Sequence, residues 1–169
     1  MLARVLLLSQ LALFSAHAQD AQSERERCAS VRPVETIQFR GKTLVEAPDV
    51  TDPRLRNANA LISGRCYEAA RSLLEKYMTE EGRDAQALYV AARYVWIHAG
   101  TEEAERAIDS FIAEYPSFVS AKVLLSGLRI EQKRFADAAE MVIELERDAP
   151  TDLWVVLNGV RVAAQRVPD

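Results

Sequence analysis

Three stretches of this chain share the same apolar residue types at a spacing of 34 residues. In each stretch an alanine stands four positions before a large apolar residue: Ala70 with Leu74, Ala104 with Ile108, and Ala138 with Val142. Each stretch ends on a helix breaker: Gly82, Pro116 and Pro150. This period is typical of stacked helix hairpins, because one hairpin cannot bury its apolar face alone. An up-and-down helical bundle would explain the apolar periodicity but not the fixed recurrence.

Capping residues and breakers between the apolar faces predict where the helices begin and end. Asp52 followed by Pro53 is a good helix start, and Asp84 and Asp152 are placed to cap later helices. Glu102 and Glu103 form an acidic first turn that suits the positive end of a helix dipole. We expect helices over about residues 53–63, 65–80, 85–99, 101–115, 117–132, 135–147 and 153–167.

The residues before the first helix do not follow the 34-residue pattern. Residues 19–26 are polar and charged, and we expect them to lack stable structure. Residues 34–39 and 43–45 flank Arg40-Gly41-Lys42, which predicts two short strands about a turn. An isolated hairpin is marginal in water, so it must lean on the helices. It would serve either as a cap over an apolar end of the stack or as an arm offered to a partner.

The helical units resemble tetratricopeptide repeats. The second helix of that family carries an alanine, a large apolar residue four positions later and a closing proline. The alanine pairs above match this half, and Gly82 replaces the first proline. The first-helix half departs from the pattern: the central unit has Leu88, Ala91, Ala92 and Val95 where the family has tryptophan, leucine, glycine and tyrosine. Over residues 51–167 the resemblance implies an all-α fold, a right-handed α-α superhelix of about three hairpins with a terminal capping helix.

Residues 1–18 predict a secretory signal peptide. Arg4 is followed by a short apolar stretch that ends on Ala16-His17-Ala18. Small residues two positions apart, here Ala16 and Ala18, are recognised by signal peptidase. A membrane anchor is the alternative, but roughly ten apolar residues cannot span about 30 Å of hydrocarbon. Cleavage after Ala18 would leave a polar and extended segment, residues 19–50, before the repeat domain. We therefore expect secretion across the inner membrane, into the periplasm.

Both cysteines, Cys28 and Cys66, belong to the exported part of the chain. An even number of cysteines in an oxidising compartment favours a disulfide. The bridge would close a loop of about 39 residues and stabilise the fold by roughly 4 kcal/mol in the chain-entropy model. A redox-active thiol pair is the alternative, but the two cysteines are far apart in sequence. We expect the bridge to tie the N-terminal segment to the first repeat.

Charge and composition argue against several functional classes. The formal charge of −4 becomes −5 once Arg4 leaves with the signal peptide. A mildly acidic chain without a Lys/Arg cluster is not expected to bind nucleic acid or, after cleavage, a membrane. His98 is the only histidine left, so a zinc cluster or a histidine-based nucleophile lacks its parts. We expect no catalytic residues, no metal and no cofactor, and therefore no enzyme.

A binding groove is better supported by the residues. Gln86, Tyr89, Arg93 and Trp96 fall on one stripe of the central first helix at three- and four-residue steps. Tyr, Arg and Trp often dominate the energy of protein interfaces. The alternative is that Tyr89 and Trp96 pack against the neighbouring repeat or the hairpin while Arg93 is solvated. Trp154 and Arg161 on the last helix could extend the same surface.

These observations favour a protein-binding function. The resemblance implies a concave groove that receives a peptide segment or a helix of another protein. We expect a periplasmic adaptor or scaffold in cell-envelope assembly. The second hypothesis is a structural subunit whose groove is filled by its own N-terminal segment, leaving the convex face or the last helix for contact. A third is an accessory that holds an envelope enzyme in place.

Overall fold

The computed structural model describes residues 22–23, 25–33 and 36–165, without the side chains of residues 98 and 99. The predicted signal peptide and the side chain of His98 therefore lie outside the described residues. The chain is mainly helical, which confirms the all-α class, with one small antiparallel sheet. In chain order the elements are β1 (Ile37–Phe39), β2 (Lys42–Leu44), α2 (Pro53–Ser63), α3 (Tyr67–Glu80), α4 (Ala85–Ala99), α5 (Thr101–Glu114), α6 (Val119–Glu131), α7 (Phe135–Asp148) and α8 (Leu153–Ala164).

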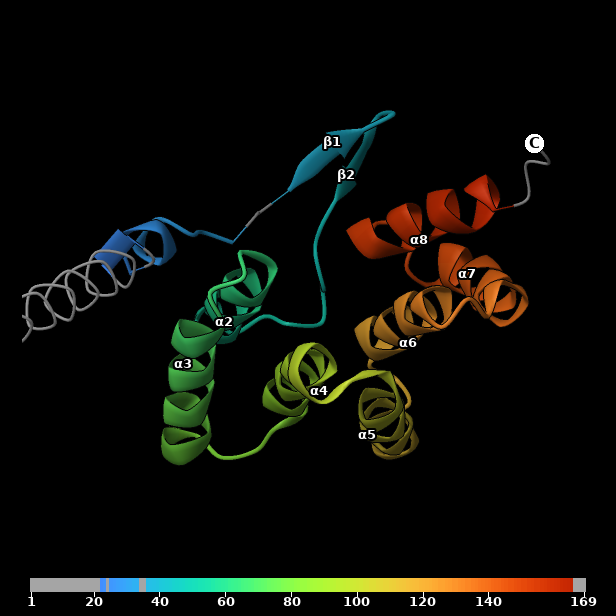
Figure 1. The fold of residues 1–169 in the computed structure, drawn as a ribbon. Helices are drawn as coiled ribbons and strands as arrows, with labels where there is room; N and C mark the ends of the chain where they lie inside the picture. The colour runs from blue at the N-terminus through green and yellow to red at the C-terminus, as the bar shows by residue number, and fades with distance from the viewer. Residues whose placement is uncertain (1–21, 24, 34–35, 166–169) are drawn as a thin grey trace, which may run out of the picture.

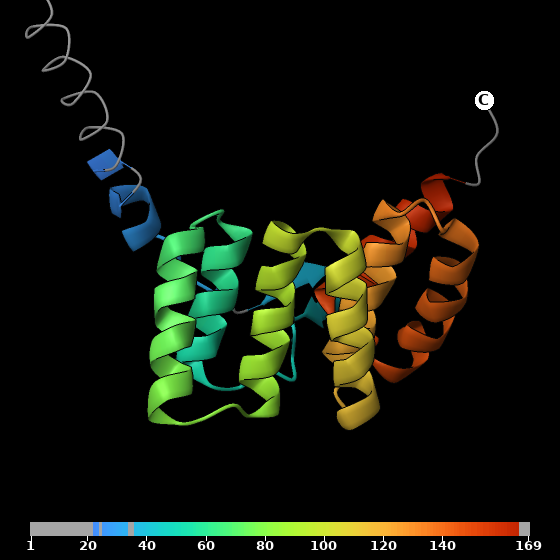
Figure 2. The same ribbon diagram turned by 60° about the horizontal axis from the view of Figure 1, so that its bottom comes forward.

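Consecutive helices pack in pairs, α2 with α3, α4 with α5 and α6 with α7. Figure 1 shows these pairs along an arc, with α2, α4, α6 and α8 on its inner side and α3, α5 and α7 on its outer side. Figure 2 shows neighbouring helices standing side by side in a row. We call the inner side of the arc the concave face. No helix in the described part of the chain is long and apolar enough to cross a membrane.

The predicted helix starts are confirmed at the capping aspartates. The side chains of Asp52, Asp84 and Asp152 accept hydrogen bonds from backbone amides in the first turns of α2, α4 and α8. The start of α3 was expected at Arg65 but lies at Tyr67. Arg65 has φ of 59°, in the left-handed region, and the Cys66 amide donates back to Leu61 O at 2.8 Å. Arg65 and Cys66, which were expected to begin the next helix, therefore form the tight C-terminal turn of α2.

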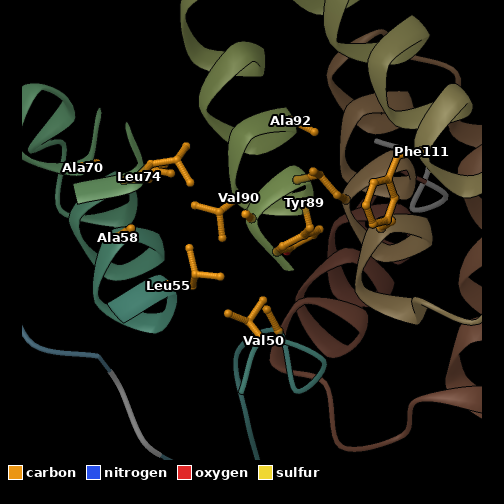
Figure 3. Packing of buried hydrophobic residues seen from close by; sticks show 14 of the residues in the cluster. Val50, Leu55, Ala58, Ala70, Leu74, Tyr89, Val90, Ala92 and Phe111 are labelled. Atoms are coloured by element: carbon orange, nitrogen blue, oxygen red, sulfur yellow. The ribbon is translucent and has the colours of Figure 1, made fainter. Parts of the chain in front are cut away.

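The residues that define the 34-residue period form the packing layer between the helices. Ala104 and Ile108 of α5 are fully buried, and their counterparts in α3 and α7 are at most 6% exposed. Figure 3 shows Leu55, Val90 and Tyr89 converging in the main core, which Val50 joins from the N-terminal segment. The alanines permit close approach of neighbouring helices, and the large residues fill the space beside them.

The N-terminal segment is more ordered than the sequence predicts. Where residues 19–26 were expected to lack structure, the described ones (22–23 and 25–26) are helical, and the helix continues to residue 29. The predicted disulfide is present: Cys28 and Cys66 are bonded, with Cα atoms 5.7 Å apart. The Arg27 guanidinium also donates to Gly64 O at 2.6 Å, at the end of α2. Polar composition alone missed this helix because its anchoring contacts come from distant residues.

The hairpin is shorter than predicted. Its strands are joined by Arg40 and Gly41, both with positive φ, 47° and 75°. Residues 34–35 of the expected first strand lie outside the described residues. Leu44 at the end of β2 is 2% exposed, whereas Phe39 is 42% exposed. The hairpin therefore rests on the rest of the protein through its second strand, beside α8 (Figure 1).

Candidate functional site on the concave face

Residues 45–52, which we call the strap, run from the hairpin across the concave face to the start of α2 (Figure 1). Val45 pairs with the loop before α8: its amide donates to Thr151 O at 2.8 Å, and its carbonyl accepts from the Leu153 amide at 2.9 Å. Ala47 and Val50 are each 2% exposed and belong to the main core. The strap is therefore part of the folded interior of the array.

Glu46 is the polar centre of the strap. Its Oε1 accepts hydrogen bonds from Arg93 Nη1 at 2.9 Å and from Ser63 Oγ and Trp154 Nε1, both at 3.1 Å. These three donors lie on α4, α2 and α8. One carboxylate thus joins the strap to three inner helices, which are far apart in sequence.

Arg93 is the partner of Glu46, and both side chains are almost completely buried, at 10% and 11% exposed. Arg93 also donates to Asn59 Oδ1 and, at 2.7 Å, to Ser63 Oγ. Its guanidinium lies 5.8 Å from the ring centroid of Trp154. A buried guanidinium needs this many partners, since an unpaired buried charge is strongly destabilising.

Two further side chains hold the strap at its far end. Gln86 Oε1 accepts from the amides of Thr51 and Asp52 at 2.6 and 3.0 Å. Asp49 Oδ2 accepts from the amide of Ser120 at 2.7 Å, in the first turn of α6. A carboxylate is favourable there because it meets the positive end of the helix dipole. All four inner helices therefore contact the strap.

The strap does not fill the whole concave face. A pocket of about 140 Å³ lies between α4, α6 and α8, with Trp96, Trp154 and Arg161 among its lining residues. Trp96 Nε1 donates to Glu131 Oε2 at 2.9 Å, which fixes the indole at the rim. Its ring also covers Gly127, where an added Cβ would lie 3.3 Å from Trp96 Cη2. The pocket thus has a rigid aromatic wall.

Two ionisable side chains of the pocket, Arg161 and Asp152, are not part of a described ion pair. Among the described residues no carboxylate lies within 4 Å of the Arg161 guanidinium, which donates only a long 3.4 Å bond to Asn158 Oδ1. Burial raises the pKa of the Asp152 carboxyl to about 6, although amide hydrogen bonds at the start of α8 lower it. The Asp49 and Glu46 carboxylates raise this pKa further. Burial also raises the pKa of the Tyr89 hydroxyl.

The predicted groove residues are divided between the strap contacts and the pocket. Tyr89, Arg93 and Trp96 line the pocket together with Trp154 and Arg161, whereas Gln86 binds the strap. Tyr89 is 4% exposed, and its ring centroid lies 5.3 Å from that of Phe118, so its ring packs inside the array. Trp96 is only partly buried. Arg93 is paired with Glu46 and not solvated. Partner binding by these residues stays a prediction.

Sequence reasoning missed Glu46, Asn59 and Ser63. A signal existed for Asn59, which stands 34 positions before Arg93 and therefore at the same register of the previous inner helix. Glu46 had no such signal because the strap is not periodic. Comparison of the chain with protein-family models, curated proteins and solved structures finds no match, so the site is interpreted from its own geometry. In the described part of the chain no cluster of His, Cys, Asp and Glu could hold a metal ion.

Proposed function

We propose that this chain is a tetratricopeptide-type adaptor or scaffold, exported to the periplasm, that binds another protein during cell-envelope assembly. The observation that carries the proposal is the open pocket between α4, α6 and α8, lined by Trp96, Trp154 and Arg161. Aromatic and arginine side chains around a concave site are the residue types that most often dominate interface energies. The disulfide supports export, because such bonds persist in oxidising compartments.

A peptide segment is the partner that this pocket suits best. A pocket of about 140 Å³ holds one side chain rather than a whole helix. The two indoles offer apolar contact, and Arg161 offers a cation that no described carboxylate neutralises. An extended segment would place one side chain in the pocket and a carboxylate near Arg161.

The second candidate is a structural subunit whose concave face is filled by its own N-terminal segment. The strap favours this reading, because it contacts all four inner helices and buries Ala47 and Val50. Partners would then bind elsewhere, on the convex face or on α8. In both candidates the chain acts by binding rather than by catalysis.

A photo-crosslinking amino acid at Glu131, on the rim of the pocket, distinguishes the two candidates in the native envelope. The adaptor predicts a crosslinked protein that disappears when Trp96→Ala and Arg161→Ala are added. The same crosslinker at Glu140, an exposed position on α7, is the matched control. Crosslinks at both positions, or crosslinks that survive the double substitution, would contradict the pocket and favour the structural subunit.

A further inference from the structure

The last helix, α8, exposes residues at positions that are buried in the earlier inner helices. Positions 58, 92, 126 and 160 share one register of the 34-residue period. Their residues, Ala58, Ala92, Ser126 and Val160, are 0%, 7%, 0% and 60% exposed. The next register, positions 55, 89, 123 and 157, shows the same break, with Leu157 38% exposed where the earlier residues are at most 4%. The exposed face of α8 therefore corresponds to the face that is buried on α2, α4 and α6.

The uncovered face is apolar, and no further helix among the described residues packs on it. Val156, Val160 and Ala163 occupy the register of Leu88, Ala92 and Val95 in α4, which face Ala107 and Phe111 of α5. The end of a repeat array normally carries polar residues on its outer side for solubility. An apolar face on the last described helix is therefore a candidate contact surface.

The hairpin forms one wall of this surface. A hollow of about 530 Å³ lies between the hairpin and α8, with Phe39 on the hairpin side and Val160 on the helix side. Arg40 and Lys42 also line it, and neither has a described carboxylate within 4 Å. Glu146 of α7 lines it as well, so the surface is an apolar groove whose rim carries two cations and one carboxylate.

We propose that this α8 groove binds an amphipathic helix of a partner protein, seated on α8 as α3, α5 and α7 are seated on α2, α4 and α6. The apolar stripe of that helix would follow the spacing of the second helices of this chain, a small residue with large apolar residues four and seven positions later. Carboxylates beside the stripe would meet Arg40 and Lys42. The groove is separate from the concave pocket and needs no occupant there.

Charge favours a partner over a second copy of this chain. The second-type helices of another copy already bury their stripes, as Ala104 and Ile108 do at 0% exposure, so among the described helices α8 is the one whose apolar stripe a copy would offer. That helix carries no Asp or Glu between Leu153 and Ala164, and it carries Arg161. It would bring another cation and no carboxylate to the rim of the groove.

The probe for this groove is a synthetic peptide of residues 101–114, the sequence of α5. It carries the Ala104, Ile108 and Phe111 stripe and five carboxylates against one arginine. Binding of the labelled peptide to the chain from residue 19 onward is measured by fluorescence anisotropy. We expect Val160→Asp to weaken binding by about tenfold or more, because a carboxylate would be buried against the stripe. Arg40→Glu with Lys42→Glu should weaken binding and reduce its salt dependence.

Two control variants test whether the loss of binding is specific to the α8 groove. Ile143→Asp changes an apolar residue of similar exposure (58%) on α7 and should leave binding unchanged, as should Trp96→Ala in the concave pocket. Circular dichroism melting checks that each variant is folded. Absence of peptide binding, equal binding to a peptide with Ile108→Asp and Phe111→Asp, or insensitivity to Val160→Asp would overturn the proposal. A native dimer in sedimentation that Val160→Asp converts to monomer would also overturn it, because a second copy would then be the occupant.

Discussion

The two ends of the helical array are covered in opposite ways. At the α2 end, the N-terminal residues are bonded to the first repeat through Cys28 and Cys66, and Ala58 is fully buried. At the α8 end, Val160 at the same register is 60% exposed, and only one wall of the groove is supplied by the hairpin. The same repeat position therefore serves stability at one end and remains available for contact at the other.

The difference in exposure arises from the second helix of each hairpin, because α3 packs on α2, where Ala58 is buried, whereas no further helix packs on α8 among the described residues. Between the two ends, the strap ties the inner helices together through Glu46 and Arg93. A stack of hairpins has only nearest-neighbour contacts, so long-range ties of this kind add cooperativity that the repeats alone lack. Stability should thus be concentrated where the N-terminal segment lies, and substitutions on the outer face of α8 should cost little.

The largest effect is expected from Glu46→Ala in the strap. The substitution leaves the Arg93 guanidinium buried without its carboxylate, and breaking a buried pair typically costs about 3–5 kcal/mol. Urea unfolding followed by circular dichroism measures the loss. Glu68→Ala, which removes an exposed pair with Arg71, is the control and should cost less than about 1 kcal/mol. Equal losses in the two variants would show that the strap does not hold the array together.

Removing the disulfide should have the next largest effect. Replacing Cys28 and Cys66 by serine opens a loop with a sequence separation of 38 residues. The chain-entropy model puts the loss of unfolding free energy at about 4 kcal/mol, and measured losses are often about 2–4 kcal/mol. Urea unfolding with and without a reductant gives the value. The reductant should destabilise the native chain and leave the double serine variant unchanged; an unaffected native chain would contradict a stabilising bridge.

Asp152 should make stability depend on pH between about 4 and 6. Its pKa is about 6 in the folded chain against an ordinary value of 3.8, so the folded state holds the proton more tightly. The unfolding free energy should therefore rise as the pH falls through this window, by about 3 kcal/mol at most from this group.

The matched variant for this pH effect is Asp152→Asn. Asparagine can still cap α8 but does not titrate, so the variant should be more stable than the native chain at pH 7 and should lose this part of the pH dependence. Unfolding free energies at pH 4.5, 5.5 and 7 test the expectation. Parallel pH profiles for the two proteins would show that burial of Asp152 does not shift its titration.

The smallest effect is expected from Val160→Asp on the outer face of α8. An exposed substitution of this kind should change the unfolding free energy by no more than about 0.5 kcal/mol. Ala92→Asp at the same register of α4 would bury an unpaired carboxylate and should cost several times more. Thermal melts of the two variants measured side by side test the contrast between the ends. A large loss in Val160→Asp would mean that the α8 face is already covered within the chain.

Much of the fold was predictable because it depends on local signals. The aspartate caps of α2, α4 and α8 were each identified correctly, since capping is decided within three or four residues. The disulfide was also predictable, because only two cysteines are available to pair. The start of α3 was wrong by two residues because Arg65 adopts a left-handed conformation that glycine usually occupies.

The candidate site was only partly predictable. Tyr89, Arg93 and Trp96 were identified from their helical spacing, and the structure brings them to one pocket with Trp154 and Arg161. Their spacing could not reveal that Arg93 is buried by a carboxylate 47 positions earlier. The strap has neither period nor motif, so nothing local in its sequence indicates which helices it contacts.

The sequence by itself determined the helices, their order, their packing faces and the disulfide. Periodicity and capping depend on residues that are close in sequence, and two cysteines allow a single pairing. Only the tertiary structure decided which faces are covered. Glu46 meets Ser63, Arg93 and Trp154 because the array brings three separate helices to one point. Val160 stays exposed because no further helix arrives on α8 among the described residues. Both outcomes depend on contacts between distant residues, and such contacts carry no signal in the local sequence.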